Sequence, residues 1–210
     1  MNKAFVFRIY PNKEQKILLA KTFGCARFIW NKMLSDKKDC YEKTGKSLKT
    51  TPARYKEEYP FLCEVDSLAL ANEQLSLEKA YKNFWNGKGK VGFPGYKSKH
   101  KDRSSYTTNY VNGNIKIADG KIKLPKLKWV TIKQHRDIPE DYKLKSCTLS
   151  QDPDGKYYVS VLFAYKETIT QQKVEKVIGL DFSMKELYVD DEGGIPEYPR
   201  FYRKAQEKLS

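Results

Sequence analysis

Apolar residues alternate with polar ones in the first ten residues of the chain. Phe5, Phe7 and Ile9 recur at a spacing of two, and Pro11 interrupts the pattern. Successive side chains of a strand point to opposite faces, so a spacing of two produces one apolar face. The sequence therefore predicts a β-strand over residues 4–10.

The apolar spacing becomes helical after Pro11. Asn12 is a suitable N-cap, and Gln15, three residues later, is its reciprocal partner in a capping box. Apolar residues then recur at helical spacing to about residue 43, and Gly45 ends the pattern. We expect one bent helix or two consecutive helices in this region.

Two further helices are predicted before the first glycine-rich segment. A short one covers residues 52–60, and a longer one begins at Asp66 or Ser67 and stops at Asn86-Gly87. The longer helix is expected to direct one set of residues towards the core: Leu68, Ala71, Leu75 and Phe84.

From residue 105 the pattern indicates short strands separated by turns. Asn-Gly or Asp-Gly pairs, which are typical of hairpin turns, occur at 112–113, 119–120 and 154–155. Candidate strands cover residues 105–111, 114–118, 121–124, 130–133, 145–150 and 157–166. Helices followed by such strands define the class as α+β, with a small barrel or sandwich. A polar linker over 167–176 then leads to a further hairpin over 177–190.

The positive charge of the chain is concentrated in one stretch. The formal net charge is +14, and residues 80–136 hold 14 Lys or Arg against two acids. Aromatic residues are interleaved with these charges: Tyr81, Phe84, Trp85, Phe93, Tyr96, Tyr106, Tyr110 and Trp129. Lysine and arginine bind phosphates, while bases stack on aromatic rings. The stretch therefore favours nucleic-acid binding, with a solubilising surface or a membrane surface as the alternatives.

A glycine-rich basic loop covers residues 87–97. It lacks the G-x-x-x-x-G-K-[ST] motif, so nucleoside triphosphate binding is not supported. Because such a loop can bury little, we expect its lysines to contact phosphates and to contribute little to folding. These lysines, with one just beyond the loop, are Lys88, Lys90, Lys97 and Lys99.

Other features argue against several classes of protein. The four cysteines form no C-x-x-C pair, so we expect small buried hydrophobes rather than a zinc site or a disulfide framework. No apolar run approaches the roughly 20 residues that cross a bilayer, and no signal peptide is visible. We therefore expect a cytoplasmic protein without a membrane partner.

Asp181 is the main candidate for chemistry. It lies at the end of the first strand of the predicted hairpin over 177–190. Nucleases of the ribonuclease H type place an aspartate there to bind Mg²⁺, and two metal ions then stabilise the attacking water and the leaving oxygen. From these residues alone, a turn-capping role beside Ser183 is the alternative.

Short motifs follow one another along the chain in a specific order. They cover residues 2–15, 24–31, 80–85, 91–94, 122–127 and 179–181. Two of them are Gly24-Cys-Ala-Arg-Phe-Ile-Trp-Asn31 and Gly179-Leu-Asp181. Together the motifs resemble the N-terminal part of the TnpB (OrfB) family of transposon-encoded, RNA-guided DNA nucleases, which are relatives of the compact type V CRISPR effectors.

The resemblance implies a domain arrangement and a set of partners. Residues 1–10 would form the first strand of a wedge-type β-barrel, 11–104 an inserted helical recognition lobe, and 105–170 the rest of the barrel. Residues 171–210 would begin a RuvC-like nuclease domain of the ribonuclease H fold. In such proteins a guide RNA reads the double-stranded target DNA by base pairing, and the protein reads a short adjacent motif. We expect a monomer in complex with RNA.

Residue types and the resemblance together nominate nucleic-acid contacts. Arg27 shares a helix with core residues and is a candidate phosphate ligand, whereas Trp30 is expected to pack. Asn112 and Asn114 match a polar turn that lies near the target-adjacent duplex in the family, and Asn can read adenine edges. Asn-Gly is also the commonest hairpin turn. Ser67 and Asn112 are expected to face the target motif. The RNA- or DNA-binding set is completed by Lys82 and Tyr110.

The chain departs from the family pattern in its catalytic acids. Only Asp181 of the expected acid set is present, and Asp190, Asp191 and Glu192 do not match the other family positions. One carboxylate cannot hold two Mg²⁺ ions, so we expect this chain alone not to cut DNA. The leading hypothesis is the N-terminal portion of an RNA-guided DNA endonuclease. The alternative is a nuclease-dead nucleic-acid-binding regulator or accessory module.

Overall fold

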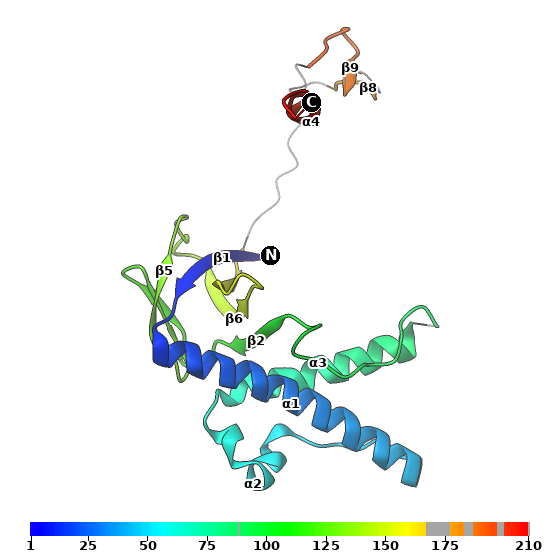
Figure 1. Cartoon of the computed structure of the whole chain (residues 1–210), viewed down its shortest axis with the longest axis vertical. Coiled ribbons are helices and arrows are strands. Elements are labelled where there is room, and N and C mark those ends of the chain that lie inside the picture. Colours follow the sequence, from blue (N-terminus) through cyan, green and yellow to red (C-terminus); the bar gives the residue numbers. More distant parts are fainter. Residues whose placement is uncertain (88, 167–176, 183–186, 197–199, 210) are drawn as a thin grey trace. The chain divides into compact units, whose positions relative to one another are not determined.

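The computed structural model describes residues 1–87, 89–166, 177–182, 187–196 and 200–209. It divides into two compact units, Met1–Glu167 and Thr168–Ser210 (Figure 1). The first unit combines helices with a curled antiparallel sheet, which confirms the α+β class. In the described part of the chain, no helix is long and apolar enough to cross a membrane.

β1 spans Asn2–Tyr10 and is the first strand that the sequence predicts. Phe5, Phe7 and Ile9 are buried, whereas the residues around them are partly or fully exposed. This pattern confirms the spacing of two and directs one face of β1 into the core.

α1 spans Lys13–Thr44 as one helix of 32 residues, so of the two predicted alternatives the pair of consecutive helices is wrong. Its N-terminus has the predicted capping box, in which Asn12 and Gln15 each accept a hydrogen bond from the other's backbone N–H. Gly45 ends the helix in the left-handed conformation at φ 65°, which glycine adopts without a steric penalty.

The region after α1 forms the predicted short helical stretch in three pieces. These are η1 (Pro52–Arg54), α2 (Tyr55–Glu58) and η2 (Pro60–Cys63). α3 (Ser67–Asn86) follows, and the Asp66 side chain accepts a hydrogen bond from the backbone N–H of Leu68 as its N-cap.

α3 buries a different face from the predicted one. Leu75, which the sequence places on the core face, is 55% exposed. α3 packs against α1 and also against β2 (Ser104–Asn109), so its buried positions follow two partners rather than one apolar stripe. The buried residues are Ala69, Leu70, Glu73 and Leu77. The other residues of the expected face are partly buried: Leu68, Ala71 and Phe84.

The strands of the first unit form one seven-stranded antiparallel sheet in the order β2-β6-β7-β1-β5-β4-β3. β1 therefore lies in the middle, paired with β7 on one side and β5 on the other. The sheet curls into a half-barrel whose two edges are β2 and β3 (Figure 1). The strands after β2 are β3 (Lys116–Ala118), β4 (Lys121–Leu124), β5 (Lys128–Lys133), β6 (Lys143–Gln151) and β7 (Tyr157–Ala164).

One of the three predicted hairpin turns has a different role. The turns at 119–120 and 154–155 join neighbouring strands, β3 to β4 and β6 to β7, as expected. Asn112 and Gly113 also form a turn, with φ 49° and 74°. However, this turn joins β2 to β3, which are the opposite edges of the half-barrel. The prediction of a hairpin there is wrong, because the dipeptide specifies the bend but not which strands it connects.

Two cores hold the first unit together, and α1 contributes to both. The inner face of the half-barrel packs against the first half of α1, including Leu19 and Phe23. The second half of α1 packs against α3 and η2, through residues such as Met33, Leu70 and Leu62. The helices and the sheet are therefore tied together by one long helix.

The second unit contains the predicted hairpin. β8 (Leu180–Phe182) pairs antiparallel with β9 (Tyr188–Asp190). α4 (Phe201–Glu207) follows. Residues 183–186, which include the predicted turn at Ser183, lie outside the described residues, as does the linker over 167–176.

Candidate nucleic-acid interface

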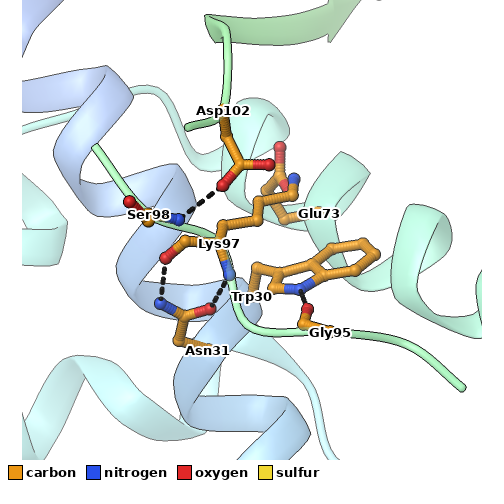
Figure 2. Close-up of polar contacts among 7 residues, drawn as sticks. All are labelled: Trp30, Asn31, Glu73, Gly95, Lys97, Ser98 and Asp102. Carbon is orange, nitrogen blue, oxygen red and sulfur yellow. Dashed lines mark hydrogen bonds and ion pairs between the residues drawn. The ribbon is translucent and has the colours of Figure 1, made fainter. Parts of the chain in front are cut away.

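The glycine-rich loop is fastened to α1 by hydrogen bonds (Figure 2). The indole N–H of Trp30 donates to the carbonyl oxygen of Gly95 at 2.9 Å. The side-chain amide of Asn31 donates to the carbonyl of Lys97 at 2.9 Å and accepts from its backbone N–H at 2.7 Å. Trp30 is buried, as predicted, and its polar group fixes the path of the loop.

Lys97 is engaged inside this arrangement. Its ammonium lies 2.6 Å from a carboxylate oxygen of Glu73 and 4.1 Å from the centre of the Trp30 ring. Glu73 is buried, and its side chain is only 8% exposed. The premise that the loop buries little is wrong at this position, because Lys97 neutralises a buried carboxylate.

The other predicted lysines have a different environment. Lys82 on α3 and Lys90 and Lys99 in the loop segment are exposed, so their charges face solvent. Lys88 lies outside the described residues.

Arg27 lies beside a small charged niche of about 160 Å³ between α1 and the start of β2. Glu73, Lys97, Asp102 and Arg103 also line this niche, so the structure brings Arg27 and Lys97 together. Arg27 is half-buried. Two of the five charged side chains are acidic, so this niche is less favourable for a phosphate than the exposed lysines are.

The residues predicted to bind nucleic acid at the 112–114 turn, and those predicted to face the target motif, have different environments. The Asn114 side chain accepts from the N–H of Val111 at 2.8 Å and donates to the carbonyl of Asn109 at 3.0 Å. Its amide therefore maintains the turn. Asn112 is exposed at the tip of the same turn, in the left-handed conformation. Ser67, at the start of α3, accepts a hydrogen bond from Lys56 at 2.9 Å.

Tyr110 directly follows β2 and is 44% exposed. It lines a groove of about 860 Å³ together with Trp129, Lys116 and Lys143. Trp129 is equally exposed. This groove combines aromatic faces with lysines, which is the chemistry that the charged stretch predicts.

Sequence reasoning missed two lysines on α1. Lys37 lies over the Tyr81 ring at 5.5 Å, and Lys38 lies over the rings of Phe93 and Tyr96 at 5.1 and 4.8 Å. Both precede the basic stretch by more than forty residues, so local composition gives no signal for them. Only the packing of α1 against α3 and the loop brings them to the aromatic residues.

Asp181 lies in β8 opposite Val189 of β9, and its side chain is exposed. The carboxylate of Asp190 accepts hydrogen bonds from the backbone N–H groups of Glu192 and Gly194, so it holds the chain after β9. Across the described residues, no three His, Cys, Asp or Glu side chains are grouped as a metal site would require. The donor type of Asp181 suits Mg²⁺, but the described residues do not supply a group of three such ligands.

The cysteines differ in environment. Cys25 and Cys147 are buried, Cys40 is half-buried and Cys63 is exposed, so the prediction of four buried thiols is wrong for Cys63. Burial raises the pKa of the Cys147 thiol to about 12. This thiol is therefore a small apolar group of the half-barrel core.

Comparison with known proteins gives matches along the whole chain. Residues 1–46 match the helix-turn-helix domain of the OrfB IS605 family model. In this structure those residues form β1 and the single helix α1, without a turn between two helices.

Three curated relatives are similar to the chain. A protein of Streptomyces pristinaespiralis named as a candidate RNA-guided DNA endonuclease is 29% identical over 221 residues, covering 100% of this chain and 53% of that protein. InsQ of Escherichia coli K12, named in the same way, is 25% identical over 216 residues, covering 99% and 52%. VsdF, a virulence protein of Salmonella dublin, is 36% identical over 108 residues, covering 44% of this chain and 89% of VsdF.

The chain belongs to the OrfB/TnpB family. It spans about half the length of the two endonuclease-named relatives and corresponds to their N-terminal part.

Proposed function

We propose that this chain is the nucleic-acid-binding N-terminal portion of a transposon-associated, RNA-guided DNA endonuclease. The observation that carries the proposal is the alignment of essentially the whole chain with two relatives that are named as candidate RNA-guided DNA endonucleases. The half-barrel and helices would then be the wedge barrel and recognition lobe that hold guide RNA and target-adjacent DNA. Under this proposal the protein would act in the cytoplasm of a bacterial or archaeal cell.

The charge and the exposed surface support an RNA partner. Lys82, Lys90 and Lys99 present positive charge to solvent, and the Tyr110 groove presents aromatic faces beside lysines. Phosphates bind the first kind of group and unpaired bases the second.

The role of Asp181 in this proposal is that of a metal ligand in the complete protein. Its exposed carboxylate on β8 would supply one hard oxygen ligand to Mg²⁺, and bound Mg²⁺ would activate water and stabilise the leaving oxygen. Because the described residues group no three acidic, His or Cys side chains as a metal site would require, we derive no cleavage step from this chain.

A binding module without nuclease activity is the second candidate. VsdF favours it, because the alignment covers 89% of VsdF but only 44% of this chain, so VsdF is the shorter protein. A segment similar to part of this chain therefore makes up most of a shorter protein.

The proposal is tested by purifying the tagged chain from cells that carry its natural locus and sequencing the RNA that copurifies. We expect one structured RNA encoded beside the gene to be strongly enriched over total RNA. Recovery of RNA in proportion to its cellular abundance would contradict a guide complex. Adding the sequence that follows in the gene and assaying RNA-directed DNA cleavage then separates the nuclease from the binding module.

A further inference from the structure

A cleft of about 710 Å³ lies at the C-terminal ends of α1 and α3, and Phe93 of the glycine-rich loop also lines it. None of the family-derived site residues except Lys82 lines it. Its walls combine aromatic and charged side chains, among them Lys38, Tyr41, Glu78, Tyr81, Trp85 and Phe93. The volume falls within the range of sites that bind small aromatic ligands.

The aromatic rings of this cleft are held in place yet remain accessible. The Phe93 ring packs edge-on against Tyr81 and Phe84, with ring centres 5.4 and 5.3 Å apart. Trp85 packs edge-on against Phe84 at 5.1 Å. Even so, Trp85 is 66% exposed and Phe93 is 45% exposed. Fixed rings with exposed surfaces lose little side-chain entropy when they stack on a flat ligand.

Positive charge surrounds the rings. Lys37 and Lys38 contact the aromatic faces and remain half-buried. A second groove of about 590 Å³ shares Lys37, Ser47 and Glu78 with the cleft and adds Lys49 and Arg54. Together the two spaces present five basic side chains and two acidic ones, Glu42 and Glu78. A ligand with one flat apolar group and flanking negative charges fits this arrangement.

We propose that the cleft binds one unpaired base of a single-stranded RNA, stacked on Trp85, with the neighbouring phosphates on the lysines and Arg54. This deepens the proposed function and rests on it. Unpaired bases splayed from single strands are the parts of RNA that proteins read by stacking. Duplex DNA keeps its bases stacked on each other and offers none to such a cleft.

The two acidic residues favour RNA over single-stranded DNA. Carboxylates repel phosphates, so a cleft that bound only the backbone would exclude them. Glu42 and Glu78, with Ser47, instead provide acceptors for hydroxyl or amino donors. The ribose 2′-hydroxyl is the donor that distinguishes RNA from DNA.

The test uses the full chain carrying Trp129→Phe, which leaves Trp85 as the exposed indole because Trp30 is buried. An adenine-only RNA oligonucleotide is titrated while Trp fluorescence and oligonucleotide anisotropy are both recorded. We expect binding to quench Trp85 strongly, and the DNA of the same sequence and length to quench it less. Adding Trp85→Ala should weaken RNA affinity about 5- to 150-fold.

The control is Leu75→Ala, which removes a side chain of similar exposure on the same helix but outside the cleft. It should change affinity less than about twofold, since it removes neither a ring nor a charge. RNA that binds by anisotropy without quenching Trp85 overturns the cleft proposal and leaves the proposed function standing. Equal quenching by DNA overturns the assignment to RNA. Failure of the unsubstituted chain, with Trp129 present, to bind any RNA by anisotropy overturns both.

Discussion

In the structure the side chain of Lys97 stabilises the fold, although the sequence predicts that it contacts a phosphate. Its ammonium meets the Glu73 carboxylate and the face of Trp30, while its backbone is held by Asn31. The Glu73 carboxylate is buried, so it needs this charge more than solvent-facing acids need theirs. Lys90 and Lys99, in the same segment, face solvent instead.

Replacement of Lys97 by Ala should therefore lower stability. Removing the ammonium leaves a buried carboxylate without its charged hydrogen-bond partner, which costs about 1.5–3 kcal/mol. Urea unfolding followed by circular dichroism measures this change in the free energy of unfolding. The matched control is Lys99→Ala, an exposed lysine in the same segment, which should change it by less than about 0.5 kcal/mol. Equal stability of the two variants would contradict the role of Lys97.

Cysteine reactivity provides a second test at this scale. Burial raises the pKa of Cys147 to about 12, so at pH 8 its thiolate is scarce as well as inaccessible. Iodoacetamide should label exposed Cys63 in the native protein much faster than Cys147, and denaturant should remove the difference. Mass spectrometry of the labelled peptides over time measures both rates. Comparable native labelling of Cys147 would show that the half-barrel core is open.

At the scale of elements, the N-terminus of α1 joins the helix to the sheet. Gln15 completes the capping box, and its side-chain amide also donates to the carbonyls of Leu127 and Trp129 at 3.0 and 2.9 Å. The Gln15 side chain thus accepts a hydrogen bond from a backbone N–H at the N-terminus of α1 and also holds the start of β5.

Gln15→Ala should destabilise the first unit by about 1–2 kcal/mol, since it removes a reciprocal cap and two tertiary hydrogen bonds. Lys16→Ala at the neighbouring exposed position serves as the control and should have little effect. Thermal unfolding of the two variants measures the difference. A destabilisation no greater than that of Lys16→Ala would mean that solvent replaces these bonds without cost.

The loop lysines allow a prediction about binding. Under the proposed function, Lys90→Ala combined with Lys99→Ala should weaken RNA binding without changing stability. The expected effect is about 1 kcal/mol for each lysine that holds a phosphate. Filter binding and urea unfolding on the same preparation separate the two effects. Unchanged affinity would remove these exposed lysines from the interface.

The sequence predicts well the parts of this molecule that local residues specify. The strand spacing of β1, the capping box of α1 and the Asp119-Gly120 turn depend on residues close together in the chain. The buried face of α3 does not follow from its own sequence, because two partners distant in the chain select it. The same reason hides the ion pair of Lys97 with Glu73 and the contact of Lys38 with Phe93.

At the scale of the whole molecule, the net charge of +14 should govern RNA affinity. Each phosphate contact releases counterions, so the logarithm of the binding constant should fall with the logarithm of salt concentration by roughly 0.7–0.9 per contact. A titration of one RNA at several salt concentrations gives this slope. A flat dependence would show that phosphates are not the main contacts.

The proposed nuclease function makes a prediction for the complete protein. Asp181→Ala there should abolish Mg²⁺-dependent cleavage and leave RNA and DNA binding unchanged, because the change removes an exposed carboxylate and leaves the core intact. Cleavage and binding assays with guide RNA and matched DNA test both parts, with Asp190→Asn as a comparison that alters the chain after β9 instead. Cleavage by the Asp181→Ala protein would place the catalytic centre elsewhere.

The central place of β1 has a consequence for biosynthesis. The N-terminal ammonium of Met1 donates to the carbonyl of Tyr165, a contact that spans 164 residues of sequence. During translation β1 emerges first, but its neighbour β7 emerges only when the first unit is nearly complete. Helical segments with local contacts fold sooner than sheets that join distant strands. The apolar face of β1 therefore waits for β7 while the rest of the first unit is synthesised, and until then only α1 and, later, β5 can cover part of it.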